Sequence, residues 1–377
     1  MTQPPNLLIV ADTEPDANML YAVGLFAPGP FIFIRVNGKC HLVAGELELD
    51  RAKKKVPHCR VISYNQCMDK LRRLHVKRPG TAAVISLLLR EERLRKIYVP
   101  ANFPFGLARD LRNYKIKVRV KKGGVFPERE FKNADEIKKI SAAIIMAEVG
   151  LAEGIQALKS SKIARDGKLM YHGVPLTAEK LRSIIDVGIL QAGGRPGHTI
   201  VACGRQACDP HEEGHGPLRG HQPIILDVFP RSRKTGYFGD LTRTVVRGRA
   251  SEPLRRLYDT VWRAQEIGFL KIRAATAASQ IHAAVHEFFE TQGYKTCKKH
   301  GQMAGFIHGA GHGLGLDIHE PPRLSLHSAD VLKPGHVLTI EPGLYYPELG
   351  GIRLEDVACV TTNGPRNLTK FEKVFEI

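Results

Sequence analysis

Five residues of the chain could together hold divalent metal ions, and four of the five are carboxylates in apolar surroundings. The five are Asp227, Asp240, His312, Glu341 and Glu355. The carboxylates stand in segments typical of buried strands, such as PIILDVFP around Asp227 and HVLTIEPGLYY around Glu341. Burying an unpaired carboxylate is costly, so four that converge would repel one another unless cations held them together. Oxygen ligands with one imidazole favour Mn²⁺ or another borderline divalent ion, and a two-metal centre of this kind is typical of hydrolases.

The spacing of the four acids indicates how the fold would bring them together. Asp227 and Asp240 are thirteen positions apart, and Glu341 and Glu355 are fourteen apart. Amphipathic helices are expected before the first pair, at 134–161 and 177–191, and before the second pair, at 252–273 and 277–294. This repeated plan of helices followed by a strand pair predicts two halves related by a pseudo-twofold axis, with both acid pairs facing one cavity.

The front of the chain has a different pattern. Residues 1–125 alternate short apolar segments with helical ones, which predicts an α/β domain with a mixed sheet. A linker is expected at 126–133, and residues 134–377 would form the second domain. The predicted fold class is therefore α/β (α+β), with two domains.

Composition limits the function classes. The net charge of +18 is concentrated at the front, where residues 1–133 hold 25 Lys and Arg against 12 Asp and Glu (+13), leaving 31 against 26 (+5). Few aromatic residues lie among these charges, so a solvated basic face is favoured over a nucleic-acid site. Seven cysteines without a CxxC pair indicate reduced thiols. The apolar runs are short for a membrane span and the first residues do not resemble a signal peptide, so a cytoplasmic protein without a membrane partner is expected.

Two motifs match known sites by chance. His211 to His215 reads HEEGH and fits the HExxH pattern of zinc proteases, but that chemistry needs a helix, and Pro210 and Gly214 favour a loop. The glycine-rich GAGHGLG has Leu314 where a dinucleotide-binding turn requires glycine. We therefore expect neither a zincin site nor a dinucleotide site.

Several motifs resemble those of the M24 (pita-bread) metallopeptidase family, which includes aminopeptidase P, prolidase and methionine aminopeptidase. The resemblance covers about residues 134–377 and rests on LDV, GYFGDLTRT, HGAGHGLGLDIHE, LTIEPGLYY and IRLEDV. The stretch DANMLYAVGLFAPGPFIFI is similar to the creatinase-type N-terminal domain of the proline-specific branch. The resemblance implies a dinuclear exopeptidase that hydrolyses Xaa-Pro bonds by a metal-bridging hydroxide. Its substrates would be peptides with proline at the second position, and it would be a homodimer.

The same resemblance assigns the metal ligands. Asp227 would hold the first metal, Asp240 and Glu355 would bridge the two metals, and His312 and Glu341 would complete the second site. The ions would be two Mn²⁺, with Co²⁺, Zn²⁺ or Fe²⁺ as alternatives. Glu341 would also carry the proton to the leaving amine.

Further residues acquire roles from the resemblance. His319 would polarise the scissile carbonyl, and His211 would act beside it in the substrate groove. His308, Arg353 and Tyr345 would bind substrate and shape the proline pocket.

The interval between the two aspartates departs from the family pattern. It is usually eleven positions, whereas here it is thirteen, so a longer hairpin tip is expected. An insertion of two preserves strand phase, and both acids can still face the same cavity.

Three alternatives to Xaa-Pro hydrolysis stay open. One is an inactive pita-bread binding module for nucleic acid or acidic proteins. The second is methionine aminopeptidase-like specificity, and the third is a metal-free relative that hydrolyses creatine. The intact set of five ligands disfavours the inactive and metal-free proteins, and the large N-terminal domain disfavours a methionine aminopeptidase.

Overall fold

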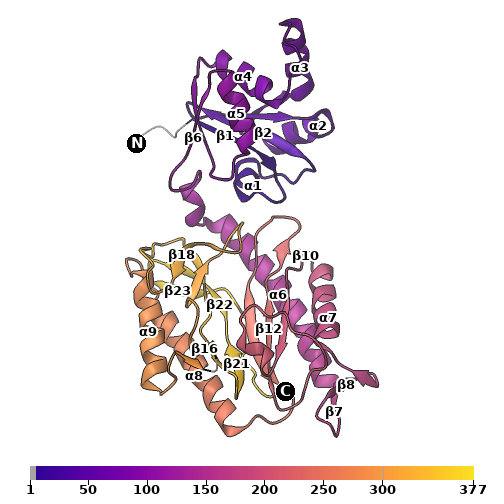
Figure 1. Cartoon of the computed structure of the whole chain (residues 1–377), viewed down its shortest axis with the longest axis vertical. Helices are drawn as coiled ribbons and strands as arrows, with labels where there is room; N and C mark the ends of the chain where they lie inside the picture. Colours follow the sequence, from indigo (N-terminus) through magenta and orange to yellow (C-terminus); the bar gives the residue numbers. More distant parts are fainter. Residues whose placement is uncertain (1–5, 300) are drawn as a thin grey trace. The chain divides into compact units, whose positions relative to one another are not determined.

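The chain folds into two compact units. The structure is a computed structural model that describes residues 6–299 and 301–377. The units divide between Arg129 and Glu130, inside the segment expected to be a linker. The N-terminal unit comprises residues 6–129, and the C-terminal unit comprises residues 130–377. Both units mix helices and strands (Figure 1), which confirms the predicted α/β class.

The N-terminal unit is a six-stranded mixed sheet in the order β4-β3-β2-β1-β5-β6. Its strands are β1 (Leu7–Asp12), β2 (Pro30–Val36), β3 (Lys39–Ala44), β4 (Cys59–Ser63), β5 (Lys96–Val99) and β6 (Lys117–Val120). Its helices are α1 (Ala17–Val23), α2 (Glu46–Lys55), α3 (Tyr64–Arg73), α4 (Thr81–Glu91) and α5 (Phe105–Asn113). Leu7 and Ile9 pack with α1 and α2, while Leu8 packs with α3, α4 and α5. Alternate side chains thus bury both faces of the sheet.

The end of this unit lies later than the expected domain boundary. Phe126 is buried in the core of the N-terminal unit, with its ring centroid 5.2 Å from that of Tyr21. Large apolar side chains such as this one gain stability by packing, so the first residue of the expected linker belongs to the core. The short 3₁₀ helix η1 (Pro127–Glu130) follows directly.

The C-terminal unit repeats one plan twice, as predicted. Its first half contains α6 (Ala134–Ser160), β7 (Lys162–Ile163), β8 (Leu169–Tyr171), β9 (Val174–Pro175), α7 (Ala178–Gln191), β10 (Gly194–Arg195), β11 (Ile200–Cys203), η2 (Gln206–Cys208), β12 (Pro223–Val228), β13 (Arg231–Ser232) and β14 (Leu241–Val246). Its second half contains α8 (Glu252–Lys271), α9 (Ala278–Thr291), β15 (Cys297–Lys299), β16 (Gln302–Ala304), β17 (Gly311–Gly313), β18 (Glu320–Leu324), β19 (Val337–Ile340), β20 (Gly343–Tyr346), β21 (Gly350–Arg353), β22 (Asp356–Thr361) and β23 (Gly364–Asn367). In each half a helix pair precedes three antiparallel strands, β11-β12-β14 in the first and β17-β19-β22 in the second.

Helix α6 is fixed at its start and along its length. Asn133 and Glu136 form a reciprocal capping box at its first turn. Gly150 and Gly154 leave room for Ile185 and Ile189 of α7, which approach closer than a Cβ atom would allow. By length and composition alone α6 could cross a membrane, but a single helix of this kind is weak evidence, and core helices of soluble proteins pass the same test.

The four acids lie at the ends of strands. Asp227 is inside β12, whereas Asp240 precedes β14, Glu341 follows β19 and Glu355 precedes β22. Three of the four thus stand just outside the ladders, because the chain leaves the sheet at these points. The interval between the aspartates contains β13, which pairs with β10, and the interval between the glutamates contains the hairpin β20–β21.

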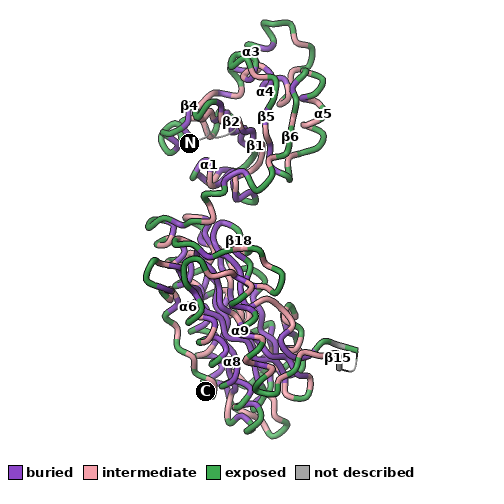
Figure 2. Tube along the Cα trace, turned by 90° about the vertical axis from the view of Figure 1, so that its left-hand side faces the viewer, coloured by how far each residue is buried: buried purple, intermediate pink, exposed green. Residues whose placement is uncertain are grey.

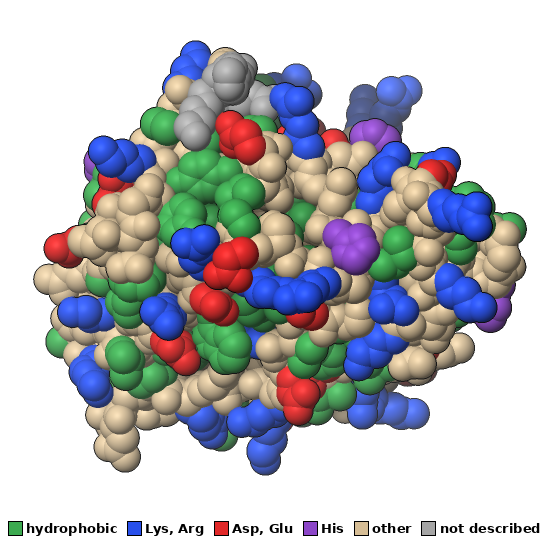
Figure 3. All heavy atoms as spheres, turned by 90° about the horizontal axis from the view of Figure 1, so that it is seen from below, with side chains coloured by type: hydrophobic (Ala, Val, Ile, Leu, Met, Phe, Trp, Pro, Cys, Tyr) green, Lys and Arg blue, Asp and Glu red, His purple; other side chains and the backbone are tan. Residues whose placement is uncertain are grey.

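Each half of the C-terminal unit has its own apolar core, and Figure 2 shows buried segments running through the unit beneath its exposed helix faces. The end of the described chain joins the two cores. Phe371 and Ile377 pack against the first core, and Phe375 packs against the second, with its ring stacked on Tyr258 at 4.1 Å. On the face in Figure 3, Lys and Arg side chains are dispersed among acidic and apolar groups.

Candidate metal centre

All five predicted metal ligands line one cavity of ≈ 850 Å³ in the C-terminal unit. Both halves of the C-terminal unit contribute residues to its lining. The further lining residues are His198, Ile200, Pro210, His211, Glu213, Phe229, Ile307, His308, Gly309, Gly311, Ile318, His319, Arg323, Ser325 and Arg353. A cavity of this size accommodates a small peptide.

The ligand atoms are close enough to share cations. One ligand atom each from Asp240, His312 and Glu355 lie within 4.8 Å of one another. His312 Nε2 is 3.6 Å from Asp240 Oδ2 and 3.4 Å from Glu341 Oε1. The other ring nitrogen, Nδ1, donates to the carbonyl of Gly313 at 3.1 Å, so the Nε2 lone pair of the neutral ring faces the carboxylates.

Asp227 has one oxygen bound and one oxygen unsatisfied. Arg353 Nη2 donates to Asp227 Oδ2 at 2.7 Å. Oδ1 is buried and has no hydrogen-bond partner. Buried polar atoms are almost always paired, so this orphaned oxygen fits a site that accepts a cation.

The electrostatics of the cavity point to the same conclusion. Burial, with repulsion from Glu355, Asp227 and Glu341, raises the pKa of Asp240 well above its ordinary value. Burial likewise raises the pKa of Glu341 to about 7, and burial with the charge of Glu341 raises that of Glu355. Burial and the neighbouring His319 lower the pKa of His312 to about 3, so its ring is neutral at pH 7. Carboxylates that resist ionisation beside a neutral imidazole are stabilised in the charged form by divalent cations, so the residues fit a dinuclear centre.

Two threonines that were not predicted orient the ligands. Thr242 Oγ1 donates to Glu355 Oε2 at 2.7 Å, and Thr339 Oγ1 lies 3.3 Å from Glu341 Oε1. Thr242 is opposite Asp227 in the ladder between β12 and β14, and Thr339 lies two residues before Glu341. The sequence signals these threonines only by their spacing of two residues from Asp240 and Glu341. The carboxylate that Thr242 contacts, Glu355, lies 113 positions away in the chain.

His308, Tyr345 and Arg353 form one hydrogen-bonded chain. Arg353 Nη1 donates to the Tyr345 hydroxyl at 2.9 Å, which donates to His308 Nε2 at 2.7 Å. His308 Nδ1 donates to the carbonyl of Gly309, so both ring nitrogens are engaged. Tyr345 is fully buried and does not line the cavity, which differs from the expected contact with substrate. Its hydroxyl instead holds two residues of the wall in place.

The remaining predicted histidines lie at the cavity. His319 is in T-shaped contact with His312, with ring centroids 4.4 Å apart, and His211 lines the opposite wall. His215, the second histidine of HEEGH, is exposed in a loop beside Gln206, so the expectation that this motif is not a helical zinc site is confirmed. Arg323, on β18, was not predicted; its guanidinium faces the cavity and makes no ion pair within the described part of the chain.

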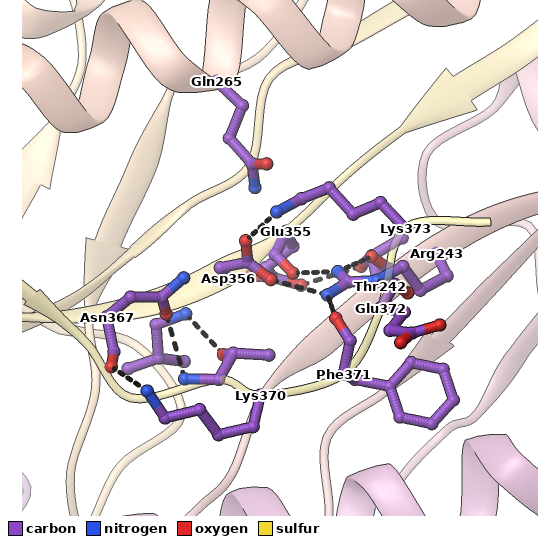
Figure 4. A network of polar contacts seen from close by, with 12 residues as sticks. Thr242, Arg243, Gln265, Glu355, Asp356, Asn367, Lys370, Phe371, Glu372 and Lys373 are labelled. Atoms are coloured by element: carbon purple, nitrogen blue, oxygen red, sulfur yellow. Dashed lines mark hydrogen bonds and ion pairs between the residues drawn. The ribbon is translucent and has the colours of Figure 1, made fainter. Parts of the chain in front are cut away.

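A buried ionic network supports Glu355 from behind (Figure 4). Arg243 donates to the carbonyls of Glu355 at 2.7 Å and Phe371 at 2.6 Å, and to Asp356 Oδ1 at 2.7 Å. Lys373 Nζ lies 2.5 Å from Asp356 Oδ2. The network thus links a metal ligand of the second half to β14 and to the end of the described chain.

Comparisons with known proteins point to one family. The sequence profile of metallopeptidase family M24 matches residues 138–362. The chain is 31% identical to a Xaa-Pro dipeptidase of Pyrococcus furiosus over 65% of its own length and 64% of that relative's length. Among solved structures, the prolidase from Pyrococcus furiosus aligns with a TM-score of 0.78 and 25% identity, covering 98% of this chain and 97% of that one. An X-Pro aminopeptidase from Thermotoga maritima aligns with a TM-score of 0.83 and 22% identity, covering 99% and 97%.

These comparisons confirm the family that the sequence motifs predicted. The profile covers more than half of the chain and includes all five ligand positions. The structural alignments extend over nearly the whole chain and so include the N-terminal unit. The protein belongs to metallopeptidase family M24.

Proposed function

We propose that the protein is a dinuclear metal-dependent exopeptidase that hydrolyses Xaa-Pro bonds. The observation that carries the proposal is the convergence of Asp227, Asp240, His312, Glu341 and Glu355 in one cavity, in a chain that resembles Xaa-Pro dipeptidases. Asp227, Asp240 and Glu355 would hold one cation. His312 and Glu341, with Asp240 and Glu355 as shared ligands, would hold the other.

The protein's own residues would then perform the acid-base chemistry. Bound divalent cations would supply a water molecule of lowered pKa and neutralise the carboxylates. Glu341, which lies in the cavity 3.4 Å from His312 Nε2, would accept a proton from that water and pass it to the leaving nitrogen. His319, beside His312, would donate a hydrogen bond to the developing oxyanion.

Arg323 supports dipeptides as the preferred substrates. Its guanidinium lines the cavity with Ser325, on the wall contributed by the second half. A carboxylate is the natural partner of an unpaired guanidinium. In an Xaa-Pro dipeptide the proline carries a free carboxylate, whereas in a longer peptide that group is an amide.

Removal and return of metal tests the activity. After chelation, we expect no hydrolysis; Mn²⁺ should restore cleavage of Leu-Pro but not of Met-Ala. Asp240→Asn should abolish metal binding and turnover together, whereas His319→Ala should lose turnover and keep its metal. Release from Met-Ala alone would contradict the proline specificity.

A second comparison separates dipeptidase from aminopeptidase. Leu-Pro should be cleaved about tenfold more efficiently than Leu-Pro-amide, since a hydrogen bond to a charged group contributes on the order of 1.5–3 kcal/mol. Arg323→Met should remove this difference. Equal cleavage of both by the unmodified protein would favour an aminopeptidase.

The finer properties are also proposals. We propose Mn²⁺ as the native metal, which elemental analysis of protein purified without added ions would test. We propose a homodimer, which light scattering would test. We propose a cytoplasmic location, supported by seven cysteines that are all unpaired. Metal content and activity together would also exclude the alternative of an inactive binding module.

A further inference from the structure

Two polar side chains at the cavity have no part in the metal centre. His198 and Glu213 both line the cavity, and His198 Nδ1 lies 2.8 Å from Glu213 Oε1. A carboxylate oxygen accepts hydrogen bonds, so the ring nitrogen is the donor. The side chains are 88% and 45% exposed, so both can contact a ligand that enters from solvent.

The strand register places this pair beyond Asp227. Ile200 of β11 is opposite Asp227 of β12 in an antiparallel ladder. His198 lies two residues before Ile200 and Phe229 lies two residues after Asp227, so both stand just beyond the ends of these strands. All four side chains line the cavity, and a Cβ atom on Gly197 would lie 2.6 Å from the Phe229 ring, which shows how closely the two segments approach.

One guanidinium fixes both segments that carry the pair. Arg182 of α7 donates to the carbonyl of Thr199 at 2.8 Å and to that of Gly214 at 2.8 Å. It also donates to the carbonyl of Glu213 itself. The backbone segments that carry His198 and Glu213 are therefore held to the same helix.

The two halves of the C-terminal unit contribute side chains of opposite charge to the cavity lining. Arg323 belongs to the second half and Glu213 to the first, on the side of Asp227. A dipeptide whose carboxylate binds Arg323 would direct its proline towards the second half. The side chain of its N-terminal residue would then extend past Asp227 towards Phe229, His198 and Glu213.

We propose that Glu213, presented by His198, is a specificity-determining residue that favours Xaa-Pro substrates in which Xaa is lysine or arginine. This inference rests on the proposed Xaa-Pro hydrolysis. The carboxylate attracts the ammonium or guanidinium group, while the Phe229 ring contacts the aliphatic stem. The attraction acts through solvent, so it falls as ionic strength rises.

Three dipeptides test the inference. Lys-Pro and norleucine-Pro differ chiefly by the ammonium group, and Glu-Pro carries the opposite charge. We expect kcat/KM for Lys-Pro to exceed that for norleucine-Pro by about two- to five-fold, as partly exposed ion pairs do. Glu213→Gln should remove this preference by lowering kcat/KM for Lys-Pro to about that for norleucine-Pro, and Glu213→Lys should shift the preference to Glu-Pro.

Matched controls separate this effect from a general change of charge or fold. Glu287→Gln removes an exposed carboxylate of α9 outside the cavity and should retain the preference. The metal content of Glu213→Gln should equal that of the unmodified protein. A Lys-Pro preference that is absent, or that survives Glu213→Gln, overturns the inference while cleavage of norleucine-Pro still supports the proposed function. Failure of the unmodified protein to cleave any of the three overturns both.

Discussion

The carboxyl groups of the metal centre take up protons or cations according to what is available. Without a cation, the raised pKa values of Asp240, Glu341 and Glu355 mean that folding retains protons which the unfolded chain has released. When divalent cations bind, they displace those protons and neutralise the carboxylates in their place. The stability of the metal-free protein should therefore depend on pH in a way that the metal-bound protein does not share.

The direction of this dependence follows from the individual groups. Glu341 has an ordinary pKa of 4.5 and a folded pKa of about 7, so its contribution to stability is complete below 4.5 and is lost as pH rises through 7. Burial of His308 and His312 acts in the opposite sense, but only below their ordinary pKa of 6.5. We expect the urea midpoint of chelator-treated protein to fall as pH rises from 6.5 to about 8.

Asp240→Asn provides the matched comparison for that measurement. The amide removes one buried negative charge, so the metal-free variant should show a smaller fall than the unmodified protein. Saturating Mn²⁺ should remove the fall only in the unmodified protein. A midpoint that rises over the same pH range would contradict the account.

At the scale of residues, the sequence predicted the metal ligands. It missed Thr242, which donates a hydrogen bond to one of them, and Arg323, which lines the cavity. Asp240 and Glu355 could be found because a carboxylate in an apolar segment is unusual. Thr242 and Arg323 are ordinary residue types in ordinary contexts. Their positions facing the cavity depend on register between distant strands, which the chain order does not contain.

At the scale of elements, helix α6 approaches the loop before β14 very closely. A Cβ atom on Gly239 would lie 2.4 Å from the backbone of Ala143, so only glycine fits between the helix and Asp240. Gly239→Ala should displace Asp240, lower stability by about 1–3 kcal/mol and weaken metal binding. Urea unfolding and equilibrium dialysis with Mn²⁺ would measure the two effects.

Gly106→Ala is the control for that substitution. Gly106, in α5, has no heavy atom near its Cβ position and no positive φ. Alanine there should leave metal affinity unchanged and stability equal or slightly higher. Unchanged metal affinity in Gly239→Ala would mean that the loop can shift without moving the ligand.

The network around Arg243 predicts coupling between the second half and the end of the described chain. Removing this buried cation leaves Asp356, which is 1% exposed, with Lys373 as its remaining partner. Arg243→Met should lower stability by about 3–5 kcal/mol and also lower metal affinity, because Glu355 loses a backbone anchor. Lys373→Met, at a side chain that is 19% exposed, should cost less. Equal losses of stability in the two variants would mean that each cation stabilises the fold only through its ion pair with Asp356.

The sequence predicted the four helices of the C-terminal unit within a few residues, and the paired plan of that unit. It did not predict the short pair β10–β13, nor that the strand-like segments at 343–346 and 350–353 form a separate hairpin, β20–β21, between the two glutamates. Segments this short have no periodicity, and they exist because neighbouring backbone supplies hydrogen-bond partners. The sequence showed that the interval between the aspartates is long, but it did not show that part of this interval forms the strand β13.

At the scale of the whole molecule, the two units have separate cores. Units with their own cores can unfold separately, so calorimetry should show two transitions. Mn²⁺ should raise only the transition temperature of the C-terminal unit. At a concentration one hundred times Kd, binding adds about 2.7 kcal/mol to the free energy of unfolding of that unit. Asp240→Asn should abolish the shift and keep both transitions, and a single transition that moves with metal would mean that the units unfold together.

The division into units could be predicted because the pattern changes from alternating short segments to long amphipathic helices near Ala134. The position of the boundary could not, since Phe126 reads as part of a linker until its contacts with Tyr21 are known.

The contacts of Arg243 also set an order of events during synthesis. Its acceptor on Phe371 lies 128 positions later in the chain. At about 5–20 residues per second, a ribosome needs on the order of 6–25 s to produce the intervening segment. During most of that interval Arg243 lacks its acceptors on Glu355 and Phe371, and Asp227 and Asp240 lack Glu341 and Glu355. The nascent first half is therefore present before the residues that complete its metal site, and this period is when it most needs protection by a chaperone.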